Sequence, residues 1–378
     1  MLSNNYLPHV SGVSTSITRT MRNLEILGHD VELIVPSAPN YTEHNQKIHR
    51  VSSLPLGEPL IPLPLPGRKL VQRIVENFKP DVLHTHHPFL LGKTALNVAK
   101  KNNIPIVMTY HSMYEEYIHY IPFFPEKILK NSVIKKVKKF ANQLDAIVAP
   151  SESISKILHE RNFKPPIQII PTGINPEYFV TPKSARLSTR KNWNVNAKDI
   201  VIISFARLAK EKNFELLLNA FAQISKEAPV PVKLVLGGDG PAKLSLQKMS
   251  KKLGLEKNVI FAGTIPHEKV PQFLAGGDIF AYPSLSETQG LVTLEALASG
   301  LPAVVVDAPG NRDVVQNNVC GLVSNTDLES FSAALIKLIK EKTLRTEFAK
   351  NAPKRADEFS EIKMAKKMEA FYMSLTSK

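Results

Sequence analysis

Short runs of β-branched and aliphatic residues alternate with amphipathic helical patterns along the whole chain of 378 residues. A strand, a helix and a further strand in this order usually return to one parallel sheet, with helices covering both faces. The sequence therefore predicts the α/β class. The expected strands are residues 31–35, 81–84, 104–109, 146–149 and 167–170, then 200–205, 232–236, 259–261, 279–281 and 303–306. In the first half, helices are expected at residues 13–27, 69–78, 91–102, 126–143 and 151–161.

The strand pattern stops near residue 170 and restarts at residue 200, after a polar stretch at 181–198. A chain of this length can form two domains with full cores. We expect two doubly wound domains, at residues 1–178 and 179–352, and a last helical segment at 353–378 that no strand follows. Ligands of such folds bind at the carboxyl ends of the strands, facing a cleft.

The start of the first domain conflicts with this pattern. A doubly wound sheet usually begins with a central strand, yet only residues 1–5 precede the loop YLPHVSGVSTSI. We expect this strand to be either truncated, with the true start upstream, or unusually short.

Composition narrows the class of partner and the compartment. The net charge of +14 favours an anionic partner. The chain lacks an aromatic RNA-binding signature, zinc-finger spacing and a helix-turn-helix pattern, so we do not expect nucleic acid. Cys320 is the only cysteine, which indicates a reducing, cytoplasmic compartment, and no run of apolar residues is long enough to span a membrane.

The segment SETQGLVTLEALASGLP, residues 286–302, contains two carboxylates eight residues apart, Glu287 in a loop and Glu295 in the following helix. Because Gly290 opens that helix, the backbone N–H groups near Gln289, Gly290, Leu291 and Val292 are expected to be unpaired and suited to a phosphate. The two carboxylates could then accept hydrogen bonds from hydroxyls at both ends of a nucleotide sugar, Glu295 from a ribose and Glu287 from a hexose.

Two earlier segments add to this expected site. Arg207 and Lys212 follow the strand at 200–205, where two cations could balance a leaving diphosphate. Gly238 lies in the turn LGGDGP after the next strand, which we expect to be a flexible, nucleotide-facing loop.

With the strand at 303–306, the segment at 286–302 resembles the donor-site signature of family 4 retaining glycosyltransferases of the GT-B fold. This resemblance implies that backbone groups near Thr264 and Ile265 read the nucleotide base, and that Gly12 lies in a loop closing over the donor phosphates. It also implies that His111 lies beside the transferred sugar, and that the last helix crosses back onto the first domain.

The segments at 84–105, 109–120 and 287–290 are most similar to bacterial 1,2-diacylglycerol glucosyltransferases. This resemblance implies a UDP-glucose donor, a lipid acceptor that could meet Tyr110 and Tyr114, and work at the inner face of the cell membrane. Front-face substitution, with the departing phosphate accepting the acceptor proton, is compatible with the sequence, because no second carboxylate is available for a double displacement. We expect no bound metal and no permanent cofactor.

A helix at 126–144 would place Leu129, Val133, Ile134, Val137, Phe140, Ala141 and Leu144 on one face. Lysines occupy much of the remainder, among them Lys135, Lys136, Lys138 and Lys139. One interpretation is a core helix with a solvated lysine face. The other, which we prefer, is a surface that docks on anionic lipid with help from the apolar loop at 54–67.

Other functions on this fold remain open from the sequence. They are the same transfer to a soluble or polysaccharide acceptor, 2-epimerisation of a nucleotide sugar, and binding of a nucleotide sugar without catalysis. The oligomeric state is not indicated.

Overall fold

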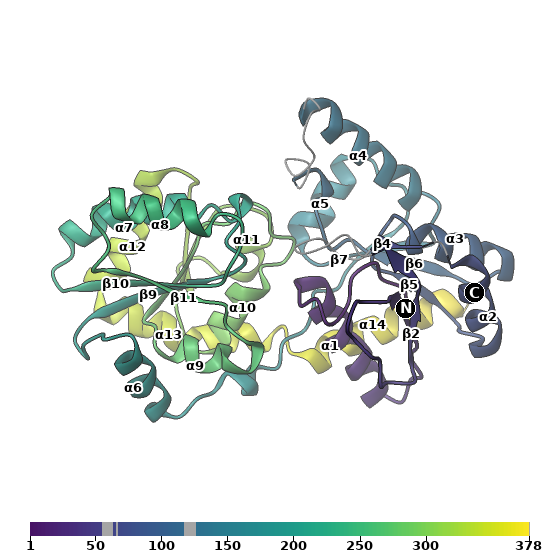
Figure 1. Ribbon diagram of the computed structural model, residues 1–378, viewed down its shortest axis with the longest axis horizontal. Helices are drawn as coiled ribbons and strands as arrows, with labels where there is room; N and C mark the ends of the chain where they lie inside the picture. The colour runs from purple at the N-terminus through teal and green to yellow at the C-terminus, as the bar shows by residue number, and fades with distance from the viewer. Residues whose placement is uncertain (55–62, 66, 117–125, 378) are drawn as a thin grey trace. The chain divides into compact units, whose positions relative to one another are not determined.

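In the computed structural model the described residues are 1–54, 63–65, 67–116 and 126–377, and they form two compact units. The first unit comprises Met1–Gly173 and Glu361–Lys378, and the second comprises Ile174–Ser360. The α/β class is confirmed, because the main sheets are parallel and helices flank them (Figure 1).

The first unit alternates strands and helices. Its elements are α1 (Gly12–Ile26), β1 (Leu33–Pro36), β2 (Ile48–Val51), β3 (Ser53–Leu54), β4 (Leu63–Pro64), α2 (Arg68–Phe78), β5 (Leu83–Thr85), α3 (Leu91–Asn102), β6 (Ile106–Thr109), α4 (Glu126–Ala141), β7 (Ala146–Ala149), α5 (Glu152–Glu160), β8 (Ile167–Ile169) and α14 (Glu361–Thr376).

Residues 1–3 occupy the central position among the parallel strands of the first unit. Leu2 bridges in parallel to Ile34 of β1 and to Thr85 of β5, and its N–H donates to the His84 carbonyl at 2.8 Å. These bridges join the pair β1–β2 to the parallel sheet β5–β6–β7–β8. The expected first strand is therefore present in its short form, and Leu2 is fully buried in the core.

The second unit contains a six-stranded parallel sheet in the order β11–β10–β9–β12–β13–β14. Its strands are β9 (Ile200–Phe205), β10 (Val232–Gly237), β11 (Val259–Gly263), β12 (Ile279–Tyr282), β13 (Ala303–Val306) and β14 (Gly321–Ser324). Its helices are α6 (Lys183–Asn192), α7 (Phe214–Glu227), α8 (Lys243–Lys252), α9 (Val270–Ala275), α10 (Leu291–Ala298), α11 (Asn311–Val314), α12 (Leu328–Lys340) and α13 (Lys342–Asp357), with short 3-10 turns η2 (Pro176–Phe179), η3 (Lys210–Lys212) and η4 (His267–Lys269). In Figure 1, α7, α8 and α12 cover one face of this sheet, and α6, α9 and α13 lie on the other.

The chain changes direction between the central strands of this sheet. β9 is followed by β10 and β11 on one side, and β12, β13 and β14 are added on the other. This is the strand order of a dinucleotide-binding fold, in which ligands bind where the order reverses, at the carboxyl ends of the strands. The reversal lies between β9 and β12.

The unit boundaries differ from the expected ones. The first change falls at Gly173 rather than at 178, because Ile174 and Phe179 are buried in the core of the second unit. The second falls after Ser360 rather than at 353, because Pro353 lies inside α13, which belongs to the second unit and packs on α10.

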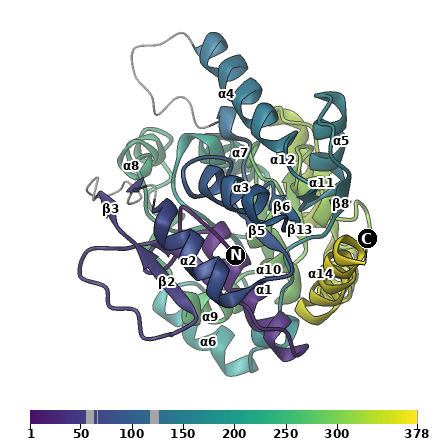
Figure 2. The same cartoon turned by 90° about the vertical axis from the view of Figure 1, so that its right-hand side faces the viewer.

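Helix α14 belongs to the first unit, where it packs against α1 (Figures 1 and 2). Its buried residues are Met364, Ala365 and Met368. At its start, the Glu361 carboxylate forms ion pairs with Arg19 and Arg22 of α1, and the Cα of Glu361 lies where only a glycine, Gly173, leaves room.

Candidate active site

Two of the expected residues meet in the second unit where the strand order of its sheet reverses, between β9 and β12. Lys212 ends the short turn η3 after β9, and Glu287 follows β12. The Lys212 Nζ lies 2.5 Å from Glu287 Oε1, and both side chains are largely buried. Because β9 and β12 are paired, their carboxyl ends bring together two residues that are 75 positions apart in the chain.

The carboxylate of Glu287 is held at one oxygen by three donors. The Tyr282 hydroxyl donates to Oε1 at 2.8 Å and the Ser284 hydroxyl donates to the same atom at 3.0 Å, in addition to Lys212. Burial tends to raise the pKa of Glu287, but the Lys212 charge and these hydrogen bonds outweigh it and leave the pKa below its ordinary value. The group is therefore an oriented carboxylate at neutral pH.

Arg207 is arranged differently. Its side chain is 47% exposed and forms an ion pair, four residues along the chain, with Glu211, whose side chain is 4% exposed. A buried carboxylate thus fixes one side of an exposed guanidinium. Glu211 was not among the expected site residues, although it lies in the same AKEK motif as Lys212.

Gly290 caps the helix that was expected to bind phosphate. It adopts a left-handed conformation (φ 80°) immediately before α10. A Cβ at this position would lie 3.3 Å from the Asn311 Oδ1, so the approach to the helix start is narrow. Gln289 precedes Gly290 and Glu295 lies in the second turn of α10, and both are buried. Leu291 and Val292 form the first turn of α10. The backbone N–H groups of that turn are the donors that the helix itself leaves unpaired.

Gly238 lies in a packed turn rather than in a flexible one. Its φ is 123°, and a Cβ would lie 1.9 Å from the Ala206 carbonyl oxygen. The loops after β9 and β10 are further joined by the Leu208 N–H, which donates to the Asp239 carbonyl at 2.8 Å. Gly238 therefore keeps the loop with Arg207 close to the neighbouring strand. Thr264 and Ile265 follow β11 at the edge of the same sheet.

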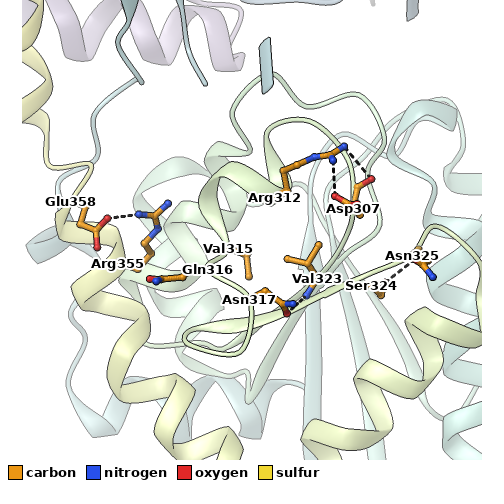
Figure 3. A pocket seen from close by; sticks show the side chains of 10 residues that line it. All are labelled: Asp307, Arg312, Val315, Gln316, Asn317, Val323, Ser324, Asn325, Arg355 and Glu358. Atoms are coloured by element: carbon orange, nitrogen blue, oxygen red, sulfur yellow. Dashed lines mark hydrogen bonds and ion pairs between the residues drawn. The ribbon is translucent and has the colours of Figure 1, made fainter. Parts of the chain in front are cut away.

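The second unit also contains a polar pocket of about 630 Å³ beside the ends of β13 and β14 (Figure 3). Its charged side chains pair with one another: Arg312 Nη1 lies 2.9 Å from Asp307 Oδ1, and Arg355 pairs with Glu358. Arg355 also donates to the carbonyls of Val314 and Asp313. None of the expected donor-site residues lines this pocket.

In the first unit, His111 follows β6 and lies beside further histidines. Its Nε2 is 2.8 Å from His86 Nδ1, and burial lowers the pKa of His111 to about 3, with a smaller contribution from the nearby His87. The ring is therefore neutral at pH 7. Gly12 is the first residue of α1, where the Ser11 hydroxyl accepts a hydrogen bond from the Ser14 N–H at 3.2 Å.

The two tyrosines expected at the acceptor differ in burial. Tyr110 is 2% exposed and packs edge-on against Phe163 in the core of the first unit, so its expected contact with an acceptor is corrected to a packing role. Tyr114 is partly exposed and contacts Phe89 and Tyr110 edge-on. Tyr114 alone of the pair keeps a surface that an acceptor could meet.

Helix α4 uses its apolar face for packing. Val137, Phe140, Ala141 and Leu144 are buried in the core of the first unit. Lys135, Lys136 and Lys139 are exposed, Lys138 is partly buried, and the first three lysines border a surface hollow of about 450 Å³ together with Ile128, which is 68% exposed. A docking surface on this helix is therefore the lysine face, not the apolar face. Most of the apolar loop at 54–67 lies outside the described residues.

Across residues 1–54, 63–65, 67–116 and 126–377, no helix is both long and apolar enough to cross a bilayer. In the same part of the chain, no group of three or more His, Cys, Asp or Glu side chains is placed to hold a metal ion.

Comparison with known families bears on both units. The model of glycosyltransferase family 4 matches residues 10–178, and the model of group 1 glycosyl transferases matches residues 185–355. The alpha-monoglucosyldiacylglycerol synthase of Streptococcus pneumoniae is 30% identical over 95% of this chain and 84% of its own length. The chain belongs to the family 4 glycosyltransferases.

Further relatives of this glycosyltransferase include a second alpha-monoglucosyldiacylglycerol synthase and a mannosyltransferase. The alpha-monoglucosyldiacylglycerol synthase of Acholeplasma laidlawii is 30% identical over the whole of this chain and 97% of its own length. A GDP-mannose-dependent alpha-mannosyltransferase of Corynebacterium glutamicum is 27% identical over 85% of this chain and 75% of its own length. The expected family is confirmed, and the chain is a hexosyltransferase by this relationship.

Solved structures identify the architecture of this glycosyltransferase. Sucrose-phosphate synthase of Thermosynechococcus elongatus covers 100% of this chain and 98% of its own, with 20% identity and a TM-score of 0.82. Anabaena HepE in complex with UDP-glucose covers 99% of both chains, with 20% identity and a TM-score of 0.79. The GT-B fold is therefore confirmed.

Proposed function

We propose that this glycosyltransferase transfers glucose from UDP-glucose to the hydroxyl of diacylglycerol, with retention of configuration, at the inner face of the cell membrane. The observation that supports the acceptor is the match to two alpha-monoglucosyldiacylglycerol synthases over nearly the full chain. The UDP-glucose complex of a structure with the same fold supports the donor. No permanent cofactor takes part in the proposal.

The second unit is proposed to bind the donor. The first turn of α10 would hold the diphosphate, with Glu295 at the ribose and Glu287 at the hexose. The Lys212 ammonium, held beside Glu287, would supply one cation to the phosphate oxygens. Arg207 would supply a second cation. Both would stabilise charge that grows as the diphosphate leaves, which is the main means of catalysis proposed here.

The first unit is proposed to face the acceptor and the membrane. The exposed Lys135, Lys136 and Lys139, with Lys138 beside them, would attract anionic headgroups by roughly 1 kcal/mol each. Ile128, exposed in the same hollow, could contact the acyl region.

The transfer is tested with radiolabelled UDP-glucose and vesicles that contain diacylglycerol, followed by extraction into organic solvent. We expect label in the organic phase. Label retained in water on a soluble product supports another acceptor, an altered sugar on the nucleotide supports 2-epimerisation, and binding without turnover supports a non-catalytic protein. A parallel reaction with labelled GDP-mannose tests the donor preference of the mannosyltransferase relatives.

The docking surface is tested by reversing the charge of Lys135, Lys136, Lys138 and Lys139 together. We expect binding to anionic vesicles to be largely lost while UDP-glucose affinity is kept. The matched control reverses four lysines on or beside α8 of the second unit, Lys248, Lys251, Lys252 and Lys257, which are exposed and change the net charge equally. Equal loss of binding in both variants would reject this docking surface.

A further inference from the structure

A row of aromatic side chains runs through the first unit from α14 to His111. His84 and His86 are two residues apart at the end of β5, and their rings stack with centroids 4.4 Å apart. The His86 ring stacks in turn on His111 at 5.1 Å. At the other end, His84 Nδ1 lies 2.5 Å from the Tyr372 hydroxyl and His84 Nε2 lies 2.8 Å from the Thr109 hydroxyl. His86 is therefore held between two rings.

The contact between His86 and His111 is a hydrogen bond between two neutral rings. His86 Nδ1 and His111 Nε2 are 2.8 Å apart. Burial, and then the nearby His84 and His111, hold the pKa of His86 well below its ordinary value, and burial also lowers the pKa of His111. A neutral imidazole has one N–H and one bare nitrogen, so one ring donates and the other accepts.

The other nitrogen of His86 indicates which ring donates. His86 is 1% exposed, and among the described residues its Nε2 has no hydrogen-bond partner. If His111 donated, the proton of His86 would lie on Nε2 as a buried, unpaired N–H. If His86 donates from Nδ1, the unpaired atom is a bare nitrogen. Buried N–H groups without an acceptor are rarer than buried acceptors without a donor, so the second arrangement is favoured.

We propose that His86 is a positioning residue that donates from Nδ1 to His111 Nε2 and thereby holds the His111 proton on Nδ1. The His111 ring is then a neutral hydrogen-bond donor to an oxygen, and it is not a base. This inference rests on the proposed function in one respect, because it assumes that His111 lies beside the transferred sugar. His84, fixed by Tyr372 and Thr109, supports the other face of the His86 ring.

Two substitutions of His86 separate hydrogen bonding from packing. In His86→Asn the side-chain amide nitrogen takes the position of Nδ1 of the native ring. In His86→Gln the amide nitrogen takes the position of Nε2 instead. We expect His86→Asn to keep most of the native kcat and His86→Gln to lower it by about tenfold with little change in KM for the nucleotide sugar, as for the loss of one oriented hydrogen bond. His159→Asn, an exposed histidine on α5, is the control for substitution itself.

Imidazole ¹⁵N spectra provide a measurement that does not depend on turnover. The His111 signals are assigned by their loss in His111→Gln. They are expected to show the proton on Nδ1 in the native protein and in His86→Asn. In His86→Gln the proton is expected to exchange between Nδ1 and Nε2. A native His111 with its proton on Nε2 would overturn the inference. If His111→Gln kept native turnover while the spectra were as expected, the proposed role of His111 would fail and the positioning by His86 would stand.

Discussion

The two units present different chemistry at the same place in their sheets, the carboxyl ends of central strands. In the second unit these ends bear charges that are paired one by one, Lys212 with Glu287 and Arg207 with Glu211. In the first unit they bear histidines that burial keeps neutral, His84, His86 and His111. A departing diphosphate needs cations, whereas sugar and lipid hydroxyls need neutral donors and acceptors. The difference therefore supports the proposed division into a donor unit and an acceptor unit.

The largest effects on activity are expected from the charged residues of the second unit. Lys212→Ala or Arg207→Ala should lower kcat by about two to three orders of magnitude, because each removes a cation that stabilises the leaving group. Glu287→Gln should weaken the positioning of the hexose and leave the affinity for UDP unchanged. Steady-state kinetics and UDP titration measure both. Arg312→Ala, which breaks an ion pair outside the proposed site, is the control, and near-native turnover in all the site variants would remove the charged half of the comparison.

The loop that holds Arg207 should be sensitive to one methyl group. Gly238→Ala places a Cβ against the Ala206 carbonyl at a φ of 123°, so we expect a loss of about 2–4 kcal/mol in the free energy of unfolding. Gly254→Ala is the matched control, because Gly254 also has a positive φ (70°) but no atom within 4 Å of the added Cβ. Urea unfolding measures both, and equal losses would show that conformation, not close packing, decides the effect.

The neutral histidines of the first unit should make the stability of the fold depend on pH. Burial lowers the pKa of His87 to about 4, so between about pH 6.5 and pH 4 the unfolded chain binds a proton that the folded chain does not. The free energy of unfolding should therefore fall as the pH is lowered through this window, by up to about 1.4 kcal/mol per pH unit for each such histidine. His87→Asn should reduce the slope below pH 6.5. An unchanged slope would mean that His87 is not held in its neutral form in the folded protein.

The smallest effect is expected at Glu295, in the second turn of α10. Glu295→Gln should weaken UDP binding by about tenfold, as for one hydrogen bond to a charged group, and should leave kcat at saturating donor nearly unchanged. Calorimetric titration with UDP measures the affinity. A large loss of kcat with unchanged affinity would place Glu295 at the reacting end of the donor instead.

Strand ends could be predicted from the sequence better than the partners of the residues on them. Lys212 and Glu287 were expected at the same edge because buried apolar runs mark β9 and β12, and parallel strands present their carboxyl ends together. The stacking of His86 on His111 depends on side-chain rotamers and on burial that no local pattern encodes. The pairing of Arg207 with Glu211 joins residues only four apart and was missed although it is local. Tyr110 was misplaced for the same reason, since its neighbours in the core, such as Phe163, are distant in the chain.

Two strands at or near the sheet edges were missed for a different reason. β2 contains the polar pair His49 and Arg50, and β14 begins with Gly321, so neither shows a continuous apolar run. Tertiary packing forms them instead. Gly321 approaches Ala303 of β13 so closely that a Cβ would lie 2.2 Å from its carbonyl oxygen. The short central strand at residues 1–3 is likewise held by neighbours on both sides.

The return of α14 to the first unit affects how the protein is made. The first unit needs Glu361–Thr376, which pack on α1 and supply Tyr372 to His84, yet these residues follow the whole second unit in the chain. During synthesis the second unit is complete while Val148 and Ile170 of the first unit still lack their contact with Met368 of α14. Domains often fold in order from the amino terminus. Here the amino-terminal unit is expected to close last, so a nascent chain stalled before residue 361 should be cut by protease within residues 1–173 and resist it within 174–360.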